Sequence, residues 1–314
     1  MTQNRSERPA RREHSQAPKG RTRRRPAPTR VWPNAPRAKD RWWRGQGPAR
    51  RPGLARFSRS CLFGALEPGS IVLGRHRCLP QSRRVNVLLR ADLVARLAAA
   101  GDPERAEGQQ RYMKSELPFH GVRVPEVRRL VGAVVRDHPL TDPDAWEETV
   151  LETWRAATHR EQRYGAIELA YALPYRGWLR PDRLAMVEEM IVTGAWWDYV
   201  DQLAGKHMGH LLATHPDDIR PVLLRWAGDD DIWRRRTAIL AQLRFKDRTD
   251  PGLLFTVIEP SIACKEFFLR KAIGWALREY SKTRPEAVTR YVEANHQRLS
   301  PLSRREAMKA LARR

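Results

Sequence analysis

The chain has 314 residues, of which 30% are charged, and a formal net charge of +23 at pH 7. Residues 1–85 hold 22 Lys and Arg against 4 Asp and Glu, so that segment carries +18 and the remainder only +5. Bulk charge therefore does not support nucleic-acid binding by the remainder, and any such function there must depend on a local patch.

Residues 1–84 are rich in Arg and Pro and lack a sustained helical or strand period, so we predict a disordered extension. Three interpretations stay open: a polybasic arm that holds polyanions, an organelle transit peptide, or a start codon assigned too far upstream. The apolar stretch from Cys61 to Leu73 is shorter than the roughly 20 residues of a membrane span. We therefore expect no membrane partner.

The three cysteines, Cys61, Cys78 and Cys264, are scattered and lack CxxC spacing, which argues against a disulfide framework or a zinc site. We expect Cys264 to be a buried helical residue in a reducing compartment.

Residues 85–314 form a succession of amphipathic patterns separated by short polar or Pro-containing turns. Strand-like alternation is absent, which predicts an all-α fold. Short paired helices without a strict repeat period suggest a solenoid of diverged HEAT-like repeats around one continuous core. We expect helices over 88–99, from 125, from 142 through 154, and over 163–173, 181–193, 216–226, 232–244, 251–262, 266–280, 285–294 and 301–311.

The segment Trp196-Trp197-Asp198-Tyr199-Val200-Asp201 is the most informative feature of the predicted solenoid. Trp197 and Asp201 lie one helical turn apart and share a face. Trp196 and Trp197 point about 100° apart, so we expect one of them to line a surface or cleft. Arg236, from the next predicted helix, would add a guanidinium able to grip a phosphate.

Two roles remain open for Asp201. It is either a structural carboxylate that caps or pairs with a neighbouring helix, or a functional one that stabilises positive charge or orients water. Asp198 points elsewhere, and we expect it to have a structural role.

The segment from Lys265 to Trp275 interleaves aromatic and basic side chains on one predicted helix, a pattern that can stack on sugars and hold a nucleic-acid backbone. We expect at least one of Phe267 and Phe268 to be buried. His207 and His210 lack a carboxylate partner at metal-ligand spacing, so we predict ordinary helix residues and no metal site.

Several separated motifs, in this order, resemble the AlkD-type DNA alkylation repair glycosylases over residues 111–311. They are Arg111-Tyr112-Met113-Lys114, Phe119-His120-Gly121-Val122, Trp196 to Asp201, Trp233 to Leu243, Glu266 to Tyr280, and Leu299 to Ala307. The resemblance implies HEAT-like repeats with a concave DNA-binding face and removal of positively charged N3- or N7-alkylated purines.

The resemblance also implies roles for individual residues. Trp197 and Trp275 would contact the deoxyribose, and Asp201 would stabilise an oxocarbenium-like sugar and position water. Arg236 would support the DNA backbone. Further DNA contacts are expected at Tyr112, Lys114, Phe267 and Lys271.

We therefore expect a monomeric, cytoplasmic DNA glycosylase of base excision repair, nucleoid-associated when on DNA. Its partner would be double-stranded DNA containing alkylated purines, and it would need neither metal nor cofactor. The alternative is a noncatalytic helical-repeat module that binds branched or damaged DNA or a protein partner. The joint presence of Trp197, Asp201, Arg236 and Trp275 favours the enzyme.

Overall fold

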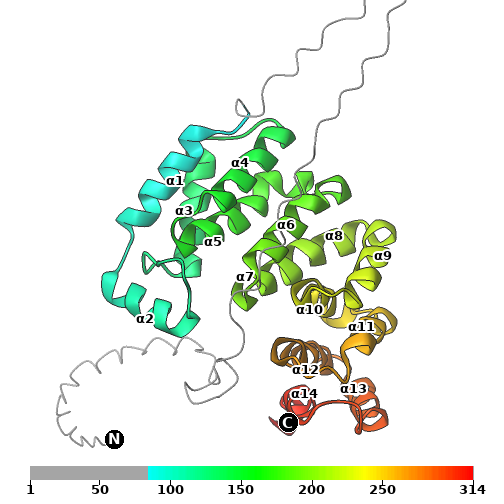
Figure 1. Ribbon diagram of the computed structural model, residues 1–314. Helices are drawn as coiled ribbons and strands as arrows, with labels where there is room; N and C mark the ends of the chain where they lie inside the picture. The colour runs from blue at the N-terminus through cyan, green and yellow to red at the C-terminus, as the bar shows by residue number, and fades with distance from the viewer. Residues whose placement is uncertain (1–83, 314) are drawn as a thin grey trace, which may run out of the picture. The chain divides into compact units, whose positions relative to one another are not determined.

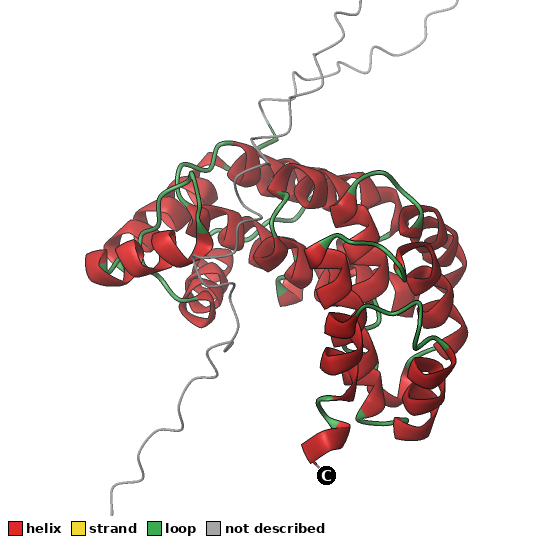
Figure 2. Ribbon diagram, turned by 60° about the horizontal axis from the view of Figure 1, so that its bottom comes forward, coloured by secondary structure: helices red, strands yellow, loops and turns green. Residues whose placement is uncertain are grey.

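The computed structural model describes residues 84–313, and every regular element in that range is helical (Figures 1 and 2). The all-α prediction is thus confirmed. The predicted disordered extension lies outside the described residues except for Arg84, whose Nη1 donates to Asp144 Oδ2 at 2.9 Å.

Fourteen α-helices follow one another in this range. The first eight are α1 (Val87–Ala99), α2 (Pro103–Met113), α3 (Val124–Asp137), α4 (Pro143–Arg155), α5 (Arg160–Ala170), α6 (Leu184–Gly194), α7 (Trp197–Gln202) and α8 (Gly209–Thr214). The others are α9 (Pro216–Ala227), α10 (Ile232–Leu240), α11 (Pro251–Ile258), α12 (Phe267–Ser281), α13 (Pro285–Ala294) and α14 (Pro301–Met308). A π-helical turn, η5 (Leu203–Met208), joins α7 to α8.

The helix starts follow local rules that the sequence already contains. Asp142 accepts from the backbone N–H groups of Asp144 and Ala145 at the start of α4, and Asp231 accepts from those of Trp233 and Arg234 at the start of α10. Such side chains satisfy N–H groups that have no partner inside the helix. Proline stands in the first turn of α2, α3, α4, α9, α11, α13 and α14, where its missing N–H costs nothing.

The core consists of two apolar clusters, one running from Leu89 to Val257 and the other from Ala204 to Ala307. Ile232, at the start of α10, packs against both, so the clusters adjoin. The sequence predicted one continuous core. The division follows from the repeat architecture, in which each helix pair packs mainly on its neighbours.

Several helix limits differ from those predicted. Helix α5 begins one turn earlier, at Arg160, and α10 ends at Leu240 because residues 241–244 form turns. Helix α2 was not predicted. Cys264 is also placed differently from the prediction, since it is partly exposed and lies in the loop before α12.

The eight tryptophans within residues 84–313 divide evenly between two environments. Trp146, Trp154, Trp226 and Trp233 are buried, whereas Trp178, Trp196, Trp197 and Trp275 are only partly buried. Within residues 84–313, no helix combines the length and apolar character needed to cross a membrane.

Candidate functional site

Helix α7 carries Trp197 and Asp201 and is only six residues long. The chain turns into it through Ala195, which has a positive φ of 41°, and Trp196, which is extended with φ −150°. The helix then continues directly into the π-helical turn η5. Trp197 and Asp201 are thereby presented on one short segment between two changes of backbone conformation.

Asp201 forms a two-point ion pair with Arg236 of α10. Arg236 Nε donates to Asp201 Oδ1 at 2.7 Å, and Nη2 donates to Oδ2 at 2.9 Å. The Asp201 side chain is 13% exposed and the Arg236 side chain is 5% exposed. Arg236 Nη1 also donates to the backbone carbonyl of Phe268 in the first turn of α12. One guanidinium therefore links α7, α10 and α12.

Burial is the main influence on the Asp201 carboxyl and raises its pKa. The charge and hydrogen bonds of Arg236 lower the pKa, and the negative charge of Asp198 raises it. The carboxylate thus lies in a weakly hydrated position, where its electrostatic attraction to a nearby positive charge is strong. Such an environment is typical of functional carboxylates, although structural ion pairs share it.

Three aromatic rings pack together, and one of them belongs to Phe268, whose backbone carbonyl accepts from Arg236. The Trp196 ring is 6.4 Å from that of Trp233 and 5.8 Å from that of Phe268, and the Trp233 and Phe268 rings are 5.1 Å apart. Trp196 and Trp197 are both partly exposed and pack against the first apolar cluster, so the expectation that one of them lines a surface or cleft stays a prediction.

Trp275 lies on α12, seven residues after Phe268. Two turns of an α-helix bring residues seven apart back to nearly the same face. Trp275 is partly exposed and packs against the second apolar cluster. The helix that receives the Arg236 hydrogen bond therefore also carries the second predicted catalytic tryptophan.

Arg236 is less available to a phosphate than the sequence led us to expect. Three of its N–H groups are engaged by Asp201 and Phe268, and its side chain is nearly buried. A phosphate contact would have to use the remaining N–H groups. In the structure Arg236 holds the Asp201 carboxylate, which is the pairing with a neighbouring helix that the sequence left open for Asp201.

Two further predicted DNA contacts lie on α12. The Phe267 ring packs edge-on against Phe268 at 5.5 Å, and Lys271 Nζ lies 3.2 Å from Glu306 Oε1 of α14. Phe267 and Phe268 are both partly exposed, so the expectation that one is buried is wrong. The end of α12 occupied by these residues also receives the bond from Arg236.

Tyr112 and Lys114 lie on a separate element, at the C-terminal end of α2. Tyr112 is 45% exposed, and Lys114 ends the helix with a left-handed φ of 49°. Both side chains are exposed. Their role as DNA contacts stays a prediction.

Asp198 faces α5 rather than α10. Its two carboxylate oxygens accept from Arg160 Nη2 at 2.7 and 2.8 Å, and Tyr164 Oη donates to Oδ2. This placement agrees with the structural role expected for Asp198. Arg160 and Tyr164 were missed because their partner lies more than 30 residues away and no local spacing indicates it.

In the part of the chain described here, no group of three His, Cys, Asp or Glu residues is placed to hold a metal ion. His207 is fully buried, and its Nε2 lies 3.0 Å from the carbonyl oxygen of Ile167. Burial lowers the pKa of His207 to about 4. The imidazole is therefore neutral at pH 7.

A family model described as DNA alkylation repair enzyme matches residues 93–311. Among solved structures, the chain is similar to a predicted DNA alkylation repair enzyme from Enterococcus faecalis. Sequence identity is 32%, the TM-score is 0.59, and the match covers 68% of this chain and 98% of the other. No curated protein matches the chain. The family match includes Trp197, Asp201, Arg236 and Trp275 and spans well over half of the sequence. The chain therefore belongs to the DNA alkylation repair enzyme family.

Proposed function

We propose that the protein is a DNA glycosylase that hydrolyses the N-glycosidic bond of positively charged N3- or N7-alkylated purines. The observation that carries the proposal is the Asp201 carboxylate, held by two parallel hydrogen bonds from Arg236 on the helix that also presents Trp197. A binding scaffold needs curvature and basic residues but has no need of a buried, oriented carboxylate beside partly exposed indoles.

The alkylated purine is already a good leaving group because it carries a positive charge. The bond between C1′ of the deoxyribose and N9 of the purine breaks, and its electron pair goes to the base, which leaves as a neutral molecule. The sugar is left as an oxocarbenium-like cation. The oxygen of a water molecule then bonds to C1′, and the water loses a proton to Asp201 or to solvent, giving free base and an abasic site.

Asp201 would stabilise the cationic sugar electrostatically and orient the attacking water. Its pairing with Arg236 fixes the carboxylate before substrate arrives, so that little reorganisation is required during the reaction. Parallel hydrogen bonds from a guanidinium favour the ionised carboxylate, which is the form that this role needs. The faces of Trp197 and Trp275 would add cation–π attraction to the sugar.

Tyr112, Lys114, Phe267, Lys271 and Arg236 would hold the DNA, with the basic groups on phosphates and the rings against sugars. Lys271 would have to share or exchange its contact with Glu306 to reach a phosphate. We further propose that the protein acts as a cytoplasmic monomer on double-stranded DNA and is nucleoid-associated when bound. Affinity that falls steeply with salt would support the phosphate contacts.

The proposal is tested by release of free base from a duplex that carries a single N7-methylguanine. Release that requires Asp201 would establish a glycosylase. A protein that binds the duplex and releases no base would instead be the noncatalytic binding module. The burial of Asp201 in an ion pair is compatible with that alternative, in which the pair would be purely structural.

A further inference from the structure

We propose that Arg160 is a positioning residue that holds α7, through Asp198, in the orientation that presents Trp197 and Asp201. The inference rests on the proposed glycosylase function and assigns a role to a residue that would not touch the substrate.

The position of α7 depends on its contacts with other helices. The segment begins directly after the extended residue Trp196 and runs through the π-helical turn η5 into α8. A π-helical turn interrupts the regular hydrogen-bond ladder and is a common site of bending in a helix. Side-chain contacts made by α7 therefore help to set its position.

Two arginines hold α7 from different sides. Arg160 of α5 binds both oxygens of Asp198, and Arg236 of α10 binds both oxygens of Asp201. Residues three apart on a helix project about 60° from one another. Two attachments at different angles restrict rotation of the helix about its axis more than either one alone, and they add to the anchoring by the fully buried Tyr199 and Val200. A shift of about 1 Å at the reacting group can cost about 100-fold in rate.

Arg160 is itself immobilised on several sides. Its Nη1 donates to Ser115 Oγ at 3.2 Å, and its backbone N–H donates to the carbonyl of Pro118 at 2.9 Å. The guanidinium carbon lies 4.2 Å from the Tyr199 ring centroid and 5.6 Å from that of Phe119. The side chains of Arg160 and Asp198 are 7% and 10% exposed, respectively. This burial makes the pair a rigid link rather than a surface ion pair.

The loop that packs against Arg160 is fixed by the next residue. Glu161 is fully buried and accepts from the backbone N–H groups of His120, Gly121 and Val122 at 3.0, 2.9 and 3.0 Å. Gly121 has φ 89°, and a Cβ there would lie 2.1 Å from the carbonyl oxygen of Asp102. These contacts hold the loop in place, and Arg160 packs against it.

The same arrangement has an electrostatic consequence for Asp201. The charge of Asp198 raises the pKa of Asp201, and Arg160 lies against Asp198 and balances that charge. Arg163 of α5 also faces α7, with its guanidinium carbon 5.9 Å from the Tyr199 ring centroid. Other charged groups on the elements around α7 pair with one another. Lys206 of η5 pairs with Glu168 of α5, and Glu188 of α6 pairs with Arg234 of α10.

Opposite pH shifts follow for two variants. The acid limb is the pH range in which base release falls as Asp201 becomes protonated. In Arg160→Gln the charge of Asp198 is unbalanced, which raises the pKa of Asp201, so the acid limb should move to higher pH. In Asp198→Asn that charge is gone, so the acid limb should move to lower pH. A role in stability alone would move neither limb.

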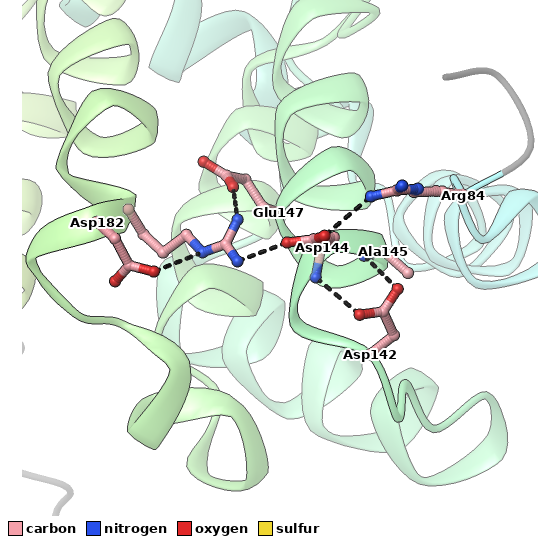
Figure 3. A network of polar contacts seen from close by, with 7 residues as sticks. Arg84, Asp142, Asp144, Ala145, Glu147 and Asp182 are labelled. Carbon is pink, nitrogen blue, oxygen red and sulfur yellow. Dashed lines mark hydrogen bonds and ion pairs between the residues drawn. The ribbon is translucent and has the colours of Figure 1, made fainter. Parts of the chain in front are cut away.

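The experiment compares Arg160→Gln, Arg160→Lys and Asp198→Asn with wild type and with the control Arg183→Gln. Arg183 also binds several carboxylates, but it lies on the α4–α6 face and is more exposed than Arg160, with Asp144, Glu147 and Asp182 around it (Figure 3). Single-turnover release of N7-methylguanine, affinity for the duplex and melting temperature are measured for each protein, and release is repeated across pH.

Arg160→Gln should lower the rate of release by ~10- to 100-fold, with a much smaller change in affinity. Arg160→Lys should recover part of the rate because an ammonium can still reach one oxygen of Asp198. Arg183→Gln should lower the melting temperature without affecting the rate. If Arg160→Gln does not fold, Arg160→Lys and Asp198→Asn still provide the rate and pH comparisons.

Equal rates for Arg160→Gln and Arg183→Gln, or acid limbs that do not move, would overturn the inference. A wild-type protein that releases no base would refute the proposed function instead. Amide hydrogen exchange of residues 197–202 separates the two failures. Faster exchange in Arg160→Gln than in Arg183→Gln would show that Arg160 holds α7 whatever the reaction, and equal exchange would show that it does not.

Discussion

Replacing Asp201 with Asn removes a negative charge from the site and changes the size of the side chain very little. Removing one preorganised group that stabilises transition-state charge costs roughly 100- to 1,000-fold in rate, or about 3–4 kcal/mol. Asp201 is buried and oriented by two hydrogen bonds from Arg236, so we expect an effect of that full size. Affinity for DNA should change little.

The same substitution should also destabilise the fold. The amide keeps one acceptor for Arg236 and turns a donor toward the other N–H group, which leaves a nearly buried guanidinium partly uncompensated. Breaking a buried pair costs about 3–5 kcal/mol. Because the Arg236 bond to the Phe268 carbonyl survives, we expect a loss near the lower end, or roughly 6–12 °C in melting temperature.

The assay is single-turnover release of N7-methylguanine from a duplex with one lesion, at a temperature at which both proteins are folded. Glu168→Gln is the matched control, because Glu168 is a buried carboxylate that pairs with Arg128 and Lys206. The control should lose comparable stability and retain its rate. Undiminished release by Asp201→Asn, or an equal loss in Glu168→Gln, would refute the assignment of Asp201 as the catalytic carboxylate.

Three further outcomes follow from the structure. Arg236→Ala leaves Asp201 buried without its partner, so urea unfolding should show a loss of about 3–5 kcal/mol, and both base release and duplex affinity should fall. Gly274→Ala should cost about 1–3 kcal/mol, measured in the same way, because a Cβ would lie 2.6 Å from the Cβ of Glu306 on α14. His207 is buried with a pKa of about 4, so protons bind the unfolded chain first as pH falls below the ordinary value of 6.5. Stability should thus decline from pH 6.5 to 4, by about 2 kcal/mol between pH 7 and pH 5, and His207→Gln should reduce that decline.

For each of these three predictions, one experimental result would contradict the reasoning. Unchanged duplex affinity in Arg236→Ala would count against a phosphate contact and leave only the positioning of Asp201. An unaltered urea midpoint in Gly274→Ala would mean that α12 and α14 separate easily. An equal loss of stability between pH 7 and pH 5 in wild type and His207→Gln would show that another group titrates in that window.

The helices could be predicted because their signals are local. An amphipathic period, an aspartate before a first turn and a proline within it act over a few residues, and Asp142 and Asp231 do cap the helices that follow them. The ends of helices were less predictable. The period in the sequence continues to Arg244, but α10 stops at Leu240.

The candidate site was predicted in part. The spacing of Trp197 and Asp201 follows from helix geometry, and the proximity of Arg236 was expected. The partners of each group were not predictable from spacing. Asp198 and Asp201 are three residues apart in one helix, and only the packing of both α5 and α10 against α7 directs one to Arg160 and the other to Arg236.

By itself the sequence determined the all-α class, most of the helices, the family motifs and the candidate residues, because these depend on local spacing and residue type. The tertiary structure alone decided that Arg236 is committed to Asp201 and Phe268, that the core divides into two adjoining clusters, and that Cys264 lies in a loop. Those properties depend on contacts between segments distant in the chain. Such contacts form only when the helices pack and water is excluded from between them.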